Sequence, residues 1–141
     1  MDPTQYQGIV IVDDGGQELG LEGNMKYFGN WSDYSSMIGD WGNITKHPIP
    51  SDPQVLFASY GTEEYEGDAV VVFVHEGQLY EVNGGHCSCY GLGEQTYSGD
   101  TESQWEPEIT SWGALNIRTL DANQHTLEAI TAFKTLVAEH L

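Results

Sequence analysis

Apolar and polar residues follow a strand-like pattern over the middle of the chain. Residues 54–59 and 69–75 are rich in apolar and β-branched side chains, and residues 78–82 alternate between apolar and polar positions. Such runs are typical of β-strands, where successive side chains point to opposite faces of a sheet. Glu76 and Gly77 separate the last two runs, so we expect a tight hairpin turn there.

The segments that flank this strand-rich block are less regular. Residues 8–12 form a short β-branched run before the turn-forming residues 13–16, which predicts a strand followed by a turn. We expect one short helix at residues 32–38, with Ser32 as its cap. Residues 84–103 are dominated by glycine and polar groups, which predicts a long surface loop.

The C-terminal part of the chain has a helical pattern. After Pro107, Thr110 or Ser111 can cap a helix that reaches about Leu120, and Asp121 can cap a second one. The apolar positions of the second helix recur three or four residues apart, at Leu127, Ile130, Phe133, Val137 and Leu141. We therefore expect an α+β fold in a single domain, 1–141, with a small antiparallel β-sheet and the C-terminal helices packed on one face.

The charge of the chain is strongly unbalanced. It carries 22 acidic and 4 basic residues, a formal net charge of −18, and no Lys or Arg lies between Lys46 and Arg118. Hydrophobic residues make up 39% of the sequence, which is too much packing material for a disordered polyanion. Such a surface repels nucleic acid and anionic membranes and attracts basic proteins, although an acidic protein without a partner would have the same composition.

The acidic residues of the Lys- and Arg-free stretch are the best candidates for contacts with a basic, nucleic-acid-binding partner. They surround the predicted hairpin and continue along the predicted loop, where an aromatic side chain would add an apolar anchor. The predicted partner-binding residues are Glu63, Glu64, Glu66, Asp68, Glu76, Glu81, Glu94, Asp100, Glu102, Trp105, Glu106 and Glu108. Arranged on a rigid sheet, these carboxylates would mimic the phosphates of DNA.

An imidazole and two thiols lie close together at His86, Cys87 and Cys89. These groups are zinc ligands, and His75 or His47 would supply a fourth, but adjacent residues rarely coordinate one metal together, so they are weak metal candidates. The alternatives are a thiol nucleophile, which the surrounding carboxylates oppose, and a structural role with buried cysteines. We expect no cofactor and assign no catalytic residue.

Other signatures of function or location are absent from the sequence. It contains no phosphate-binding loop, dinucleotide fingerprint or nucleophile elbow. The first residues lack the basic stretch and apolar core of a signal peptide, and no apolar run is long enough to span a membrane. We therefore expect the protein to act in a cytoplasm.

Four specific segments stand out between Tyr60 and Trp112. They are YEGDA at 65–69, GQLYEVNG at 77–84, HCSCYGL at 86–92 and QWEPE at 104–108. Together they resemble a pattern of short uncharacterised bacteriophage proteins, for which no family activity is established. The resemblance implies a phage origin, and small acidic phage proteins often neutralise host enzymes that handle nucleic acid.

Charge and resemblance lead to the same hypothesis. The chain is expected to be a non-enzymatic phage protein that binds and inhibits a host CRISPR effector, restriction enzyme or RNA polymerase in the host cytoplasm. One alternative is a small metal-binding or thiol enzyme centred on His86, Cys87 and Cys89. Another is a phage structural or assembly module that associates through exposed aromatic side chains.

Overall fold

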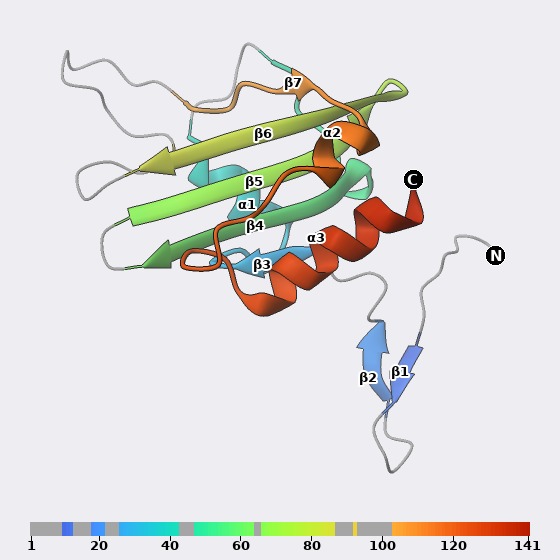
Figure 1. Cartoon of the computed structure of the whole chain (residues 1–141). Coiled ribbons are helices and arrows are strands. Elements are labelled where there is room, and N and C mark those ends of the chain that lie inside the picture. The colour runs from blue at the N-terminus through green and yellow to red at the C-terminus, as the bar shows by residue number, and fades with distance from the viewer. Residues whose placement is uncertain are drawn as a thin grey trace.

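A computed structural model of the chain describes residues 10–12, 18–21, 26–42, 47–63, 66–86, 92 and 103–141. A five-stranded sheet consists of β3 (Tyr27–Gly29), β4 (Val55–Glu63), β5 (Glu66–His75), β6 (Gln78–His86) and β7 (Glu108–Ile109), in that order across the sheet (Figure 1). Two further strands, β1 (Val10–Val12) and β2 (Glu18–Leu21), pair with each other in an antiparallel hairpin. The strand predicted at residues 8–12 is thus observed over its last three residues, and residues 8 and 9 lie outside the described part of the chain.

The pairing of β3 with β4 is parallel, whereas the other neighbours in the five-stranded sheet are antiparallel. The sheet is therefore mixed, and the expectation of a purely antiparallel sheet is wrong for this pair. The long connection between the two strands explains the difference, because it carries the chain back to the end where β3 began. This connection contains the helix α1 (Tyr34–Asp40) and the short 3-10 helix η2 (Asp52–Gln54).

β5 is the central strand of the sheet and is buried on both faces. Val70 and Val72 belong to one apolar cluster and Val71 and Phe73 to the other, and all four side chains are fully buried. Burial on both faces explains why this strand is a continuous apolar run rather than an alternating one. The hairpin predicted between β5 and β6 is confirmed, since its two turn residues have the positive φ angles, 50° and 78°, that a type I′ turn requires.

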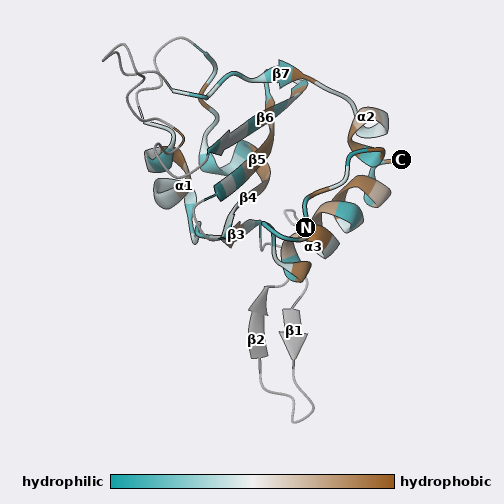
Figure 2. Cartoon of the chain, turned by 60° about the vertical axis from the view of Figure 1, so that its left-hand side comes forward, coloured by the Kyte–Doolittle hydropathy of each residue, from teal (hydrophilic) through white to brown (hydrophobic). Residues whose placement is uncertain are grey.

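Helix α1 covers one face of the sheet (Figure 2). Its N-cap is Asp33, whose carboxylate accepts a hydrogen bond from the Ser36 backbone N–H at 2.8 Å, so the helix begins two residues later than predicted and Ser32 is not its cap. Met37 of this helix packs with the indole rings of Trp31, Trp41 and Trp105 in one core cluster. The aromatic residues of the irregular segments therefore form the hydrophobic layer on this face.

Helices α2 (Trp112–Asn116) and α3 (Leu127–Glu139) cover the opposite face, so the predicted α+β arrangement is confirmed (Figures 1 and 2). Ser111 caps α2, as one of the two proposed caps, but the helix ends at Asn116 rather than near Leu120. Thr126, not Asp121, caps α3. None of the described helices is long and apolar enough to cross a membrane.

The residues around the start of α3 differ from the predicted helix. Asp121 closes a turn, because its carboxylate accepts a hydrogen bond from the Asn123 backbone N–H at 2.8 Å. The two ends of the predicted apolar face, Leu127 and Leu141, are 77% and 66% exposed. The buried side chains of α3 are Ala129, Phe133 and Val137.

The turn that precedes α3 packs directly onto β4 at Gly61. A Cβ atom at this position would lie only 1.5 Å from the carbonyl oxygen of Gln124. No side chain fits into that space, so the glycine allows the turn to approach the sheet at backbone distance.

We expect Gly61→Ala to lower the free energy of unfolding by about 2–3 kcal/mol, because the added methyl group forces the turn off the sheet. Gly39→Ala is the control, since a Cβ there meets nothing within 4 Å. Gly39 lies in α1, where alanine is favoured over glycine by about 1 kcal/mol. Urea unfolding measures both effects, and a Gly61→Ala protein as stable as the wild type would contradict this packing.

Candidate functional site

Glu63 and Glu66 face each other across the turn that joins β4 to β5. Directly opposite side chains in an antiparallel pair lie about 5 Å apart on the same face of the sheet. Both glutamates are exposed, and among the described residues no ion pair reaches either of them. We call this pair the hairpin carboxylates.

The hairpin carboxylates project from the face that carries α2 and α3. Ser59 and Gly61 of β4 contact the turn before α3, and alternate residues of a strand share a face, so Glu63 lies on that face too. Two other predicted partner-binding residues on this face are already engaged. Asp68 lies 2.7 Å from His125, and Glu81 lies 2.8 Å from Arg118.

The remaining predicted partner-binding residues do not form one surface. Glu76 lies at the other end of β5 from Glu66, roughly 30 Å away for a strand of this length. Glu106 and Glu108 are exposed at the β7 edge of the sheet. Four of the predicted residues lie outside the described part of the chain, namely Glu64, Glu94, Asp100 and Glu102.

Trp105 does not form the exposed aromatic anchor that we predicted. Its side chain is only 1% exposed, and its ring stacks on Phe73 with a centroid separation of 5.6 Å. The indole N–H donates a hydrogen bond to the Pro48 carbonyl at 2.9 Å, which satisfies the polar group inside the core. Trp105 is therefore a core residue and cannot contact a partner.

Ser59, His125 and Asp68 form a hydrogen-bonded chain that the sequence did not reveal. Ser59 Oγ lies 2.7 Å from His125 Nδ1, and Asp68 Oδ2 lies 2.7 Å from His125 Nε2. Since a carboxylate can only accept, Nε2–H donates to Asp68, and in the neutral imidazole Nδ1 accepts from the Ser59 hydroxyl. Ser59 and Asp68 come from neighbouring strands and His125 from the turn before α3, so these hydrogen bonds attach this turn to the sheet.

The Ser59–His125–Asp68 chain has the residue types of a hydrolase triad but not its accessibility. A catalytic serine must reach a substrate carbonyl beside hydrogen-bond donors for the oxyanion. Ser59 is fully buried and His125 is 3% exposed, so no substrate reaches the hydroxyl group. These three hydrogen-bonded residues therefore have a structural role. No motif spacing could have indicated them, because His125 is 66 residues from Ser59 and 57 residues from Asp68.

The histidine of the proposed thiol or metal site is hydrogen-bonded within the fold. His86 Nε2 lies 2.5 Å from the Tyr60 hydroxyl, and the two rings meet edge to face. Cys87 and Cys89 lie outside the described residues. Within the described part of the chain, no group of three or more His, Cys, Asp or Glu side chains is arranged to hold a metal ion.

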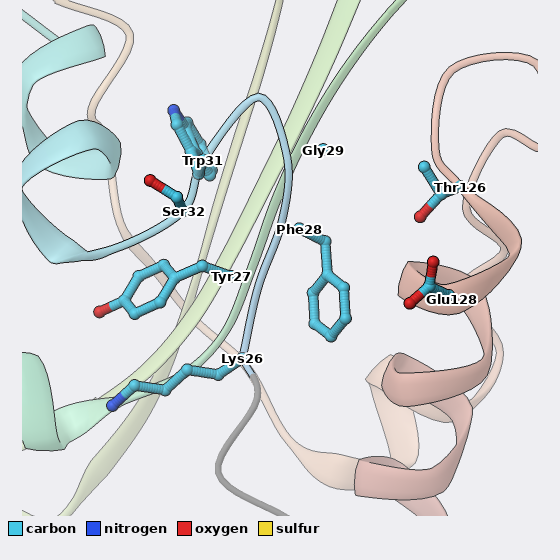
Figure 3. Close-up of a pocket in the computed structure, with 8 residues that line it drawn as sticks. All are labelled: Lys26, Tyr27, Phe28, Gly29, Trp31, Ser32, Thr126 and Glu128. Carbon is cyan, nitrogen blue, oxygen red and sulfur yellow. The ribbon is translucent and has the colours of Figure 1, made fainter. Parts of the chain in front are cut away.

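A groove of about 510 Å³ lies along β3 at the edge of the sheet (Figure 3). It is lined by Tyr27, Phe28 and Trp31 on the sheet side and by Thr126 and Glu128 on the side of α3. The close-up shows Tyr27 and Phe28 on opposite sides of the strand. No local pattern could have predicted this groove, because residues 26–32 and residues 126–128 form it together.

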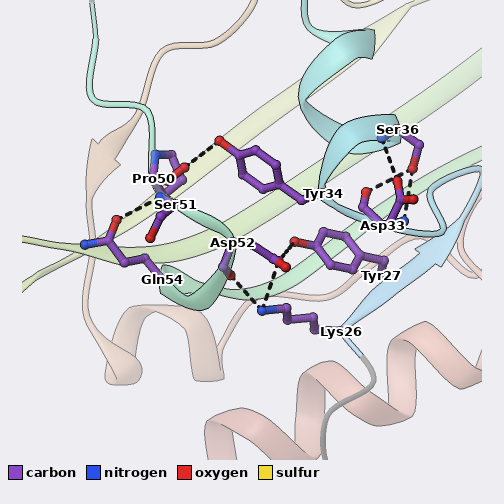
Figure 4. Close-up of polar contacts among 9 residues, drawn as sticks. All are labelled: Lys26, Tyr27, Asp33, Tyr34, Ser36, Pro50, Ser51, Asp52 and Gln54. Carbon is purple, nitrogen blue, oxygen red and sulfur yellow. Dashed lines mark hydrogen bonds and ion pairs between the residues drawn. The ribbon is translucent and has the colours of Figure 1, made fainter.

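Polar contacts attach the start of β3 to η2 (Figure 4). Lys26 Nζ lies 3.2 Å from the Asp52 carboxylate and donates a hydrogen bond to the Asp52 carbonyl at 2.7 Å, while the Tyr27 hydroxyl donates to the same carboxylate. Burial and this hydrogen bond raise the pKa of Tyr27, and burial likewise raises the pKa of Tyr34, whose hydroxyl donates to the Pro50 carbonyl at 2.6 Å. The hydrogen bond from Tyr27, assisted by Lys26, lowers the pKa of Asp52.

Comparison with models of protein families, with curated proteins and with solved structures yields no match to this chain. The geometry and charge of the described surface are therefore the features that bear on function. Its distinctive features are the hairpin carboxylates and the groove along β3.

We expect Ser59→Ala to lower the free energy of unfolding by about 1–3 kcal/mol, because it leaves the buried Nδ1 of His125 without a partner. Ser35→Ala, at an exposed position of α1, is the control and should change stability by less than about 0.5 kcal/mol. Urea unfolding gives both values. Equal effects of the two substitutions would show that the buried hydrogen bond contributes nothing.

We expect Asp52→Asn to lower stability at neutral pH by less than about 1 kcal/mol, since the side chain is 55% exposed. Folding lowers the pKa of Asp52 from its usual value of 3.8. The ionised carboxylate therefore stabilises the fold at pH values above 3.8, and this contribution is lost as the pH falls through the lowered pKa. The stability difference between wild type and variant should therefore shrink as the pH falls below 3.8 and the Asp52 carboxylate becomes protonated in the folded protein. Unfolding curves recorded from neutral to acidic pH test this, and a difference that grows on acidification would contradict it.

Proposed function

We propose that this chain is a non-enzymatic, phage-encoded acidic protein that acts in the host cytoplasm. It binds a host protein that handles nucleic acid, such as a CRISPR effector, a restriction enzyme or RNA polymerase, and occupies the basic site that normally holds phosphates. The hairpin carboxylates, Glu63 and Glu66, form the centre of the contact. The proposal rests chiefly on their placement.

The hairpin carboxylates are unfavourable for the fold itself. Like charges placed directly opposite each other in an antiparallel pair destabilise it, and no described cation compensates these two. By contrast, Arg118 compensates Glu81, which lies opposite Glu108 in another cross-strand pair. An uncompensated pair of this kind supports a role in binding a cationic partner rather than a role in stability.

The scaffold behind the hairpin carboxylates anchors the two strands from which they project. Ala58 of β4 and Ala69 and Val70 of β5 are fully buried, so both strands are anchored in the core just before the turn. A backbone that is already ordered need not be ordered on binding, and exposed charges increase the association rate with an oppositely charged site. In the sequence, Glu64 adds a further negative charge between the two.

The net charge of the whole molecule favours the same kind of partner. With a formal charge of −18, the chain is attracted at long range to any site built from Lys and Arg. Among the described cations, Lys26 and Arg118 are held in ion pairs with Asp52 and Glu81, so they do little to offset the exposed acids. Duplex DNA and this protein should therefore compete for the same basic surface.

We expect Glu63→Gln/Glu66→Gln to weaken partner binding by at least about tenfold and to reduce its salt dependence, because two charges of the contact are lost. The same variant should be more stable than the wild type by about 0.2–1 kcal/mol, because the like-charge pair is removed. A tagged full-length chain captures the partner from bacterial lysate, with duplex DNA as competitor, and titration with the purified partner gives the affinities.

Glu139→Lys is the matched control, because it changes the net charge by the same amount at the far end of α3. Strong binding by this control together with loss in the hairpin variant would locate the contact at the hairpin. An equal loss of partner binding in both variants would mean that net charge alone, and not the hairpin, determines the affinity. A partner that DNA does not displace, or that binds the hairpin variant as tightly as the wild type, would overturn the proposal.

A further inference from the structure

β3 is an edge strand of the sheet, and no other strand of the described residues pairs with its outer side. Towards β4, the Lys26 carbonyl accepts from the Ala58 N–H at 2.7 Å and the Asn30 N–H donates to the Tyr60 carbonyl at 2.8 Å. The two groups of a trans peptide point in opposite directions, and Phe28 pairs with β4 between the Lys26 carbonyl and the Asn30 N–H, so the N–H and C=O groups of Tyr27 and Gly29 lie on the outer side. Gly29 has a φ angle of 71°, so the extended backbone of β3 ends there. No hydrogen bond from another described residue reaches these outward groups.

The groove along β3 gives this open edge the shape of a strand-binding site. Its volume of about 510 Å³ lies between the start of α3, at Thr126 and Glu128, and the segment that leads into α1, at Trp31 and Ser32 (Figure 3). An extended segment placed here would pair its backbone with β3 and set alternate side chains against the two sides of the groove. The edge is short, so the side chains must contribute part of the affinity.

Charge determines which segment fits. Glu128 is an exposed carboxylate in the lining, whereas the ammonium group of Lys26 is held by Asp52. Asp33, which follows the lining residue Ser32, is also exposed, and its carboxylate caps α1. A second copy of this chain is a poor occupant, because two molecules of charge −18 repel each other.

We propose that the groove binds an extended basic segment of the partner protein, which adds to β3 as a further strand. Its backbone hydrogen-bonds with Tyr27 and Gly29, and a Lys or Arg side chain pairs with Glu128. The basic character of this segment rests on the proposed function, whereas the strand addition rests on the open edge itself. The partner is thus held at two places, by the hairpin carboxylates and by β3.

The test uses the full-length protein and an acetylated, amidated hexapeptide of alternating Lys and Val. We expect the amide NMR signals of Tyr27 and Gly29 to shift on titration and their hydrogen exchange to slow by about tenfold, because both N–H groups become hydrogen-bonded. A fully N-methylated version of the peptide keeps its charge, but it cannot donate to the Tyr27 and Gly29 carbonyls, and its methyl groups prevent the close approach of a strand to β3. It should leave both amides unprotected.

Glu128→Lys should weaken peptide binding by about fivefold, since it reverses the charge that the peptide meets in the groove. Glu139→Lys, on the same helix but outside the groove, is the control and should bind like the wild type. The strand addition would be overturned if the N-methylated peptide bound as tightly as the unmodified one. It would also be overturned if the amide NMR signals shifted only around Glu63 and Glu66. Those results would leave the proposed function standing, because that depends on loss of partner binding in the hairpin variant.

Discussion

The burial of β5 on both faces is the constraint on which the rest of the structure depends. Five consecutive side chains, from Ala69 to Phe73, are fully buried, so each face of the strand needs its own cover. α3 supplies one cover with Phe133 and Val137, and the tryptophan-rich segments around α1 supply the other. Buried residues of the segments before β4 and after β6, such as Trp41 and Trp105, therefore pack on one face of the sheet. Their sequences show no regular apolar pattern.

This central strand also explains how an acidic chain tolerates its charge. The core is almost entirely apolar, and its polar exceptions, Ser59 and His125, are satisfied by hydrogen bonds to each other and to Asp68. Most of the described carboxylates belong to residues at the ends of strands and helices or in turns, where water screens exposed charges. The hairpin carboxylates lie where the buried part of β4 and β5 ends, so they are exposed and yet attached to a rigid support.

Local signals predicted the local elements well and the contacts between distant segments poorly. The hairpin at Glu76 and Gly77 was predictable because two turn residues with positive φ determine it. Helix ends were less predictable, because neighbouring residues such as Ser32 and Asp33 can both cap a helix and the packing of α1 selects one. Trp105 was assigned to the surface because acidic residues surround it in sequence, whereas its apolar ring had a place in the core beside Phe73.

The sequence by itself determined the α+β class, the central apolar strand, the β5–β6 hairpin and the excess of carboxylates, since each depends on composition or on residues close together along the chain. Only the tertiary structure decided that β3 pairs in parallel with β4 at the edge of the sheet, and that His125 joins Ser59 to Asp68. It likewise decided which acids remain unpaired, because Arg118 is 37 positions away from Glu81. Such contacts join segments far apart in sequence, and their geometry follows from how the two core layers pack on the sheet.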